Sequence, residues 1–203
     1  MFKDRTDAGN ALALKLKKYK GKDGVILAIP RGGVPVAAVL ARELGMPMEV
    51  LLSKKIGHPL NPEYAIGAVS LEDRVISPHP DVDEEYIEKE TVRIRKKLAE
   101  HYHRFMGDKQ PIPLHDKIVI IVDDGIATGN TLLSTLPMIR KQRPKKIIIA
   151  VPVSPSGAVL RLSRSVNEMV VALIPDAFYG VGGFYEDFRQ VSDEEVVGYM
   201  TGQ

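Results

Sequence analysis

Two adjacent acidic residues, Asp123 and Asp124, follow the apolar run IVIIV at 118–122 and precede a stretch of small residues. The apolar run predicts a buried strand that delivers both carboxylates at its end. Neighbouring carboxylates raise each other's cost of ionisation, and Mg²⁺ or hydroxyl groups that donate hydrogen bonds would relieve that cost. The pair therefore indicates a site for a magnesium ion or for a hydroxylated ligand.

The residues after the acidic pair, GIATGNT at 125–131, carry little side-chain bulk. Gly125 and Gly129 allow tight turning, and the backbone amides of 127–131 can converge on an anion where a helix begins. The hydroxyls of Thr128 and Thr131 add hydrogen-bond donors. The ligand should therefore carry both a phosphate and a hydroxylated portion, and a ribose phosphate meets both requirements.

Two other phosphate-binding motifs do not fit the sequence. A P-loop needs a lysine before its final Ser or Thr, whereas here Asn130 precedes Thr131. The segment PRGGVPVAA at 30–38 lacks the G-x-G-x-x-G spacing of a dinucleotide-binding turn.

The elements that must position these residues follow an alternating pattern. Apolar strands are expected at 24–29, 48–53, 117–122, 146–151 and 168–174, and helices at 4–18, 35–44, 81–105, 130–141 and 156–163. A capping box of Ser192 and Glu195 starts a short last helix. We expect a loop at 56–64, which is rich in glycine and proline, and a small hairpin at 65–76. The pattern predicts an α/β fold, a three-layer arrangement with a parallel sheet flanked by helices, whose carboxyl edge presents the acidic pair.

Composition restricts the class of protein. The 203 residues are 44% apolar with a net charge of +2, which fits a globular domain and gives no basic patch for nucleic acid. The chain has no cysteine, no signal-peptide pattern and no run of membrane-spanning length, so we expect a cytoplasmic protein without a membrane partner. The five histidines form no metal set, and His101 and His103 are expected on a solvated surface. The sequence leaves a homo-oligomer open.

The segment VIIVDDGIATGNT at 119–131 resembles the phosphoribosyl-pyrophosphate motif of the type I phosphoribosyltransferases. The resemblance implies one domain over 1–203, with residues 56–116 as a lid or insertion and 175–203 as part of a small hood. In the hood, Phe178, Tyr179, Phe184 and Tyr185 would either stack on a base or form core.

The resemblance also implies a role for each matching residue. Asp123 and Asp124 would bind the ribose hydroxyls, directly or through water on Mg²⁺. The groups holding the 5′-phosphate would be Gly125, Ala127, Thr128, Gly129, Asn130 and Thr131. Those contacting pyrophosphate would be Arg31, Gly32 and Gly33 after the first strand, and Lys54 and Lys55 after the second. Arg31, Lys55 and the acidic pair are the candidate catalytic residues; otherwise the two lysines are a solvated strand end.

The implied activity is a glycosyltransferase of nucleotide metabolism. It would transfer ribose 5-phosphate from phosphoribosyl pyrophosphate to a nitrogenous base or amine, with Mg²⁺, and release pyrophosphate. The alternative is a non-catalytic regulatory protein that senses phosphoribosyl pyrophosphate or a nucleotide. The apparent pyrophosphate groups favour the enzyme, because a sensor of a nucleoside monophosphate would not need them. Six-oxopurine transferases carry an Asp where this chain has Ala127, so hypoxanthine and guanine are expected to be poor acceptors.

Overall fold

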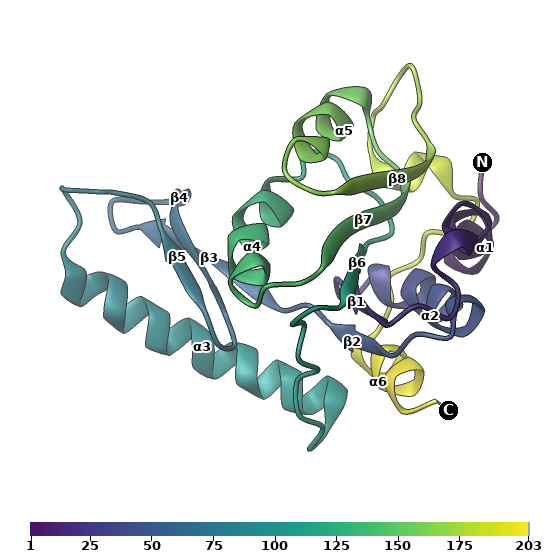
Figure 1. Cartoon of the computed structure of the whole chain (residues 1–203). Helices are drawn as coiled ribbons and strands as arrows, with labels where there is room; N and C mark the ends of the chain where they lie inside the picture. The colour runs from purple at the N-terminus through teal and green to yellow at the C-terminus, as the bar shows by residue number, and fades with distance from the viewer. Residues whose placement is uncertain (203) are drawn as a thin grey trace.

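Five apolar strands form a parallel sheet in the computed structural model, which describes residues 1–202 (Figure 1). Their order across the sheet is β2 (Met48–Val50), β1 (Gly24–Ala28), β6 (Ile118–Val122), β7 (Lys146–Val153) and β8 (Glu168–Leu173). All four neighbouring pairs are parallel, so their carboxyl ends lie at one edge of the sheet. The predicted parallel sheet is confirmed.

The two faces of the sheet are covered by different helices. Alternate strand residues, represented by Ile26, Ile120 and Ile148, pack with α1 (Arg5–Leu16) and α2 (Gly33–Leu44). The intervening residues, represented by Val119 and Ile149, pack with α4 (Asn130–Lys141) and α5 (Ser156–Ser163). Since successive side chains of a strand point to opposite faces, continuous apolar strands need cover on both sides. The result is the predicted three-layer α/β fold.

The helix ends follow the capping chemistry of the sequence. The carboxylate of Asp4 accepts from the Asp7 amide at 2.8 Å and starts α1. Ser192 and Glu195 form the predicted capping box of α6 (Asp193–Thr201). Gly45 ends α2 with a φ of 68°, a left-handed conformation that costs glycine little.

The segment between β2 and β6 differs from the expectation. The predicted second strand divides into β2 and β3 (Ser53–His58), and the expected loop at 56–64 is wrong, because β3 pairs with β4 (Asn61–Ser70) in an antiparallel hairpin. Cross-strand hydrogen bonds override the weak strand preference of glycine and proline. The hairpin expected at 65–76 exists as the pairing of β4 with β5 (Arg74–Ile76), and α3 (Glu84–Met106) follows. Figure 1 shows this antiparallel sheet and α3 beside the main sheet.

The carboxyl-terminal segment after β8 contains a 3₁₀ turn, Val181–Phe184, and packs on the start of the chain. Phe178, Phe184 and Tyr185 pack into a small cluster around Ala8, whereas Tyr179 is 98% exposed. Three of the four candidate stacking aromatics therefore serve as core. Within residues 1–202, no helix is both long and apolar enough to cross a membrane.

The packing of the central strands generates a stability prediction. Ile148 is fully buried in β7, so Ile148→Ala should lower the free energy of unfolding by about 2–5 kcal/mol through lost burial and a cavity. Urea denaturation measures this loss. The control is Leu160→Ala on α5, which is 60% exposed and should change stability by less than about 0.5 kcal/mol. Equal losses in both variants would contradict the assigned core.

Candidate phosphate and ribose site

The acidic pair lies at the carboxyl edge of the sheet, beside the glycine turn that follows β1. The amide of Ile29 donates to the carbonyl of Val122 at 2.8 Å, which ties the turn to the end of β6. A Cβ atom on Gly32 would stand 1.9 Å from the Oδ2 atom of Asp124. Only glycine at position 32 therefore allows the turn to lie against this carboxylate.

Arg5 of α1 neutralises one of the two carboxylates. Its Nε and Nη2 atoms lie 2.9 and 2.8 Å from Asp124 Oδ2, and its Nη1 donates to the carbonyl of Arg189 at 2.9 Å. The guanidinium also stacks 4.1 Å from the ring centre of Phe188, and Tyr185 donates its hydroxyl to the Asp124 carbonyl at 2.6 Å. Burial raises the pKa of Asp124, but Arg5 opposes that shift and favours the ionised form.

Asp123 has no such partner. Its Oδ1 atom accepts a hydrogen bond from the Asp124 amide at 2.8 Å, and no basic side chain of residues 1–202 forms an ion pair with it. Burial, followed by the charge of Asp124, raises the pKa of Asp123 well above its ordinary value of 3.8. Asp123 is therefore the group at this edge that a bound cation or a donating hydroxyl would stabilise most.

The start of α4 supplies an open set of backbone amides next to the pair. Gly129 precedes the helix in a left-handed conformation with a φ of 72°, and no side chain caps the helix. Ala127, Thr128, Asn130 and Thr131 line the loop and the first turn, where the chain is largely exposed. Uncapped amides at a helix start carry partial positive charge, which makes this loop suitable for a phosphate.

A basic cavity of about 340 Å³ opens on the other side of the glycine turn. Its charged and titratable lining groups are Arg31, Lys54, Lys97, His101 and Asp193. The Nη1 atom of Arg31 lies 3.3 Å from Asp193 Oδ1, so α6 holds this arginine from the hood side. The excess of basic groups suits an anion of higher charge than a single phosphate monoester.

The structure brings most of the sequence candidates to this sheet edge. They are Arg31, Gly32, Gly33, Asp123, Asp124, Gly125, Ala127, Thr128, Gly129, Asn130 and Thr131. Lys54 lines the basic cavity, but Lys55 does not, because adjacent side chains on β3 point to opposite faces. The Nζ atom of Lys55 instead bonds to Glu63 Oε2 at 2.9 Å.

Three residues of the site were not predicted from the sequence, namely Arg5, Lys97 and Asp193. Arg5 lies 119 positions from its partner Asp124, and no local pattern in a terminal helix identifies such a contact. Lys97 and Asp193 lie on helices whose charged residues all look like solvated surface in the sequence. His101 is exposed, as expected, yet it borders the basic cavity.

Known proteins resemble this chain in sequence and in fold. Residues 3–189 match the family model described as the phosphoribosyl transferase domain. A Mycobacterium tuberculosis (H37Rv) protein, whose name marks it provisionally as a phosphoribosyl transferase, is 38% identical over 208 residues, covering 98% of this chain and 46% of that protein. The chain thus spans about half the length of this relative.

Two further relatives are similar over very different lengths. A ribose-phosphate pyrophosphokinase from Pyrococcus furiosus is 39% identical over 62 residues, which is 30% of this chain and 22% of that enzyme. A crystal structure of a Thermus thermophilus protein superposes with a TM-score of 0.89 and 36% identity, covering 99% of this chain and 98% of that one. Because the family model matches nearly the whole length and the relatives agree with it, the chain belongs to the phosphoribosyltransferase family.

Proposed function

We propose that the protein transfers ribose 5-phosphate from phosphoribosyl pyrophosphate to a nitrogenous base or amine, using Mg²⁺ and releasing pyrophosphate. The observation that carries the proposal is that three groups of different chemistry meet at one sheet edge. The open amides of α4 follow Asp123 and Asp124 in the chain, and the glycine turn that lies against this pair also contributes Arg31 to the basic cavity. These three features match the phosphate, ribose and pyrophosphate of that substrate.

Each part of the edge has a distinct task in this proposal. The amides and hydroxyls of 127–131 hold the 5′-phosphate, and Asp123 accepts hydrogen bonds from the ribose hydroxyls. Arg5 fixes the orientation and charge of Asp124, which therefore acts as a second, pre-oriented acceptor. The Thr128 hydroxyl accepts only a long hydrogen bond from the Asn130 amide, at 3.5 Å, so it is free to turn toward a phosphate.

The residues present fit Mg²⁺ of the kind that substrate oxygens help to coordinate. Over residues 1–202, no three His, Asp or Glu side chains gather into a metal cage. Mg²⁺ commonly binds one or two carboxylates and completes its shell with water and substrate phosphates. Asp123, with Asp124 through water, would hold it, and the bound ion would supply positive charge beside the pyrophosphate.

Breaking the bond between ribose C1 and pyrophosphate leaves positive charge on the sugar and negative charge on the leaving group. Arg31 and Lys54 at the basic cavity stabilise that negative charge as it develops. The acceptor nitrogen then bonds to C1 and loses a proton to solvent. No side-chain nucleophile is needed.

A regulatory module that only binds phosphoribosyl pyrophosphate is the second candidate. It is favoured by the length of the mycobacterial relative, more than half of which lies outside the match with this chain. Turnover separates the two candidates.

The direct test is a screen of purines, pyrimidines and simple amines for Mg²⁺-dependent pyrophosphate release. With at least one acceptor, pyrophosphate release should depend on both the substrate and the enzyme. Hypoxanthine and guanine should be poor acceptors because position 127 is alanine. Binding of phosphoribosyl pyrophosphate without release for any acceptor would favour the regulatory module. Efficient use of guanine would contradict the inference from Ala127.

Ligand binding should also stabilise the fold. Phosphoribosyl pyrophosphate with Mg²⁺ at about one hundred times its dissociation constant should add about 2.7 kcal/mol to the free energy of unfolding, because it binds only the folded chain. Differential scanning calorimetry measures the accompanying rise in Tm. Ribose 5-phosphate alone should give a smaller rise, and no shift with millimolar phosphoribosyl pyrophosphate would refute the site.

Asp123→Asn tests the acidic pair without disturbing the Arg5 contact. Loss of this charge should weaken phosphoribosyl pyrophosphate binding by about tenfold or more, equivalent to about 1.4 kcal/mol. An acid whose pKa is raised by folding stabilises the fold below its unfolded pKa of 3.8 and loses that contribution as pH rises through the folded pKa. At neutral pH the asparagine variant should therefore be more stable than the parent when no ligand is bound.

Isothermal titration and urea denaturation at pH 7 measure the two effects of Asp123→Asn. Asp108→Asn, at a fully exposed side chain, is the matched control and should change neither. A variant that loses stability but keeps its affinity would show that Asp123 only supports the turn.

A further inference from the structure

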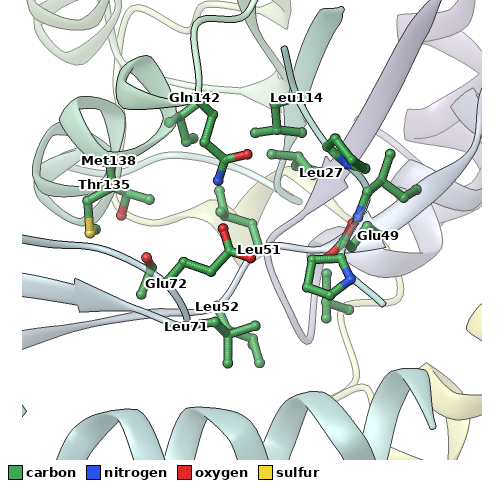
Figure 2. Close-up of a pocket in the computed structure, with 16 residues that line it drawn as sticks. Leu27, Glu49, Leu51, Leu52, Leu71, Glu72, Leu114, Thr135, Met138 and Gln142 are labelled. Carbon is green, nitrogen blue, oxygen red and sulfur yellow. Dashed lines mark hydrogen bonds between the residues drawn. The ribbon is translucent and has the colours of Figure 1, made fainter. Parts of the chain in front are cut away.

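A second cavity, of about 300 Å³, lies between the edge of the main sheet, the antiparallel sheet and α4 (Figure 2). Its walls come from β1 and β2, the turn between β4 and β5, the connection that precedes β6, and the last turns of α4. None of residues 30–33 or 123–131 lines it, so it is separate from the site proposed above. Its volume lies near the lower end of the range for small-molecule pockets.

The lining is apolar with ionisable groups of one kind. Leucines from three different segments, Leu27, Leu51 and Leu71, form much of the wall, while the ionisable lining groups are the carboxylates of Glu49 and Glu72. The lining contains no Lys, Arg or His. Figure 2 shows the Glu72 carboxylate and the Gln142 amide directed into the space, with Glu49 on the facing wall. We call this space the acidic cavity.

Glu49 is the unusual group in this acidic cavity. It is only 5% exposed, on an edge strand, and its two oxygens accept from the Tyr102 hydroxyl at 2.9 Å and the Ile112 amide at 2.7 Å. These two bonds orient the carboxylate without supplying a positive charge. Burial raises the pKa of Glu49 above its ordinary value against both bonds, and the nearby charge of Glu72 adds to the shift.

A buried carboxylate costs free energy unless a positive charge is near. Within residues 1–202 the fold does not supply that charge, since the partners of Glu49 are a hydroxyl and an amide and no basic side chain lines the cavity. A ligand that brought a cation on a hydrocarbon body would satisfy both carboxylates and fill the leucine-lined space. An anionic ligand, phosphate-bearing substrates included, would meet two like charges here.

We propose that the acidic cavity is a binding site for a small organic ammonium ion with an apolar body, held by Glu49 and Glu72. Its walls are shared with functional elements, because Thr135 and Met138 belong to the helix whose first turn forms the phosphate loop. The hydroxyl of Thr135 bonds to Ser53 at 2.7 Å, one position before Lys54 of the basic cavity. The cavity therefore adjoins the transferase site while containing none of residues 30–33 or 123–131, so the cation and phosphoribosyl pyrophosphate would occupy different places.

The test uses three compounds of nearly equal size on the full chain: cyclohexylmethylamine, cyclohexylmethanol and cyclohexanecarboxylate. Isothermal titration should show saturable binding of the amine, with the alcohol weaker by about tenfold and the carboxylate weaker still, because only the amine brings a positive charge to hydrogen-bond with the two carboxylates. Methyl NMR shifts should map to Leu51 and Leu71. Equal binding of the alcohol, shifts elsewhere, or no saturable binding of the amine would overturn the proposal.

Substitutions test whether the two carboxylates themselves bind the amine. Glu72→Gln, on an exposed turn, should weaken the amine several-fold, and Glu49→Gln should weaken it more. Should Glu49→Gln fail to fold, Glu72→Gln and the compound series still decide the matter. Glu100→Gln, an exposed acid on α3 outside the cavity, is the control and should bind the amine as the parent does.

Asp123→Asn distinguishes this proposal from the transferase site. It should keep full affinity for the amine even though its binding of phosphoribosyl pyrophosphate is reduced. Loss of amine binding in Asp123→Asn would place the amine at the transferase site and overturn the separate cavity. Unchanged amine affinity in both Glu72→Gln and Glu49→Gln would do so as well.

Discussion

Two adjacent carboxylates lie at the edge of the sheet, but one buried arginine pairs with only one of them. The packing around the site depends on this single ion pair. Arg5 forms an ion pair with Asp124, and Asp123 has no positive partner among residues 1–202. Because Arg5 also bonds to Arg189 and stacks on Phe188, the same ion pair fastens the first helix to the carboxyl-terminal segment. The contact that neutralises Asp124 thus also holds the hood in place, and the Asp123 side chain remains available to a ligand.

Close backbone approach makes this arrangement possible. The turn after β1 can lie against the acidic pair only because Gly32 has no side chain, and the hood can close on Gly125 for the same reason. A Cβ on Gly125 would stand 2.4 Å from Val181 Cγ1. These glycines therefore serve packing around a charged centre, in addition to any role in turning the chain.

The insertion between β2 and β6 contributes to two cavities of opposite charge. Lys54 of β3 faces the basic cavity, and the turn at Glu72 faces the acidic cavity. Leu52 lines both cavities, and the hydrogen bond between Ser53 and Thr135 lies at their boundary. The lining charges are therefore mostly basic on one side of this boundary and acidic on the other.

The sequence by itself determined the parallel sheet, its flanking helices and the position of the main motif, but not the antiparallel pairing of β3 with β4, where a loop was expected. Strand and helix periodicity, the capping box of Ser192 and Glu195 and the run at 119–131 are local features, which a single sequence shows directly. Only the tertiary structure decided which charges meet. Arg5 reaches Asp124 from a distant part of the chain, Lys54 and Lys55 separate because of the strand pleat, and Glu49 becomes buried because α3 and residue 112 close over it. Such pairings depend on long-range packing, which sets how deeply each side chain is buried and how far apart two charged groups lie. No local pattern in the sequence encodes these quantities.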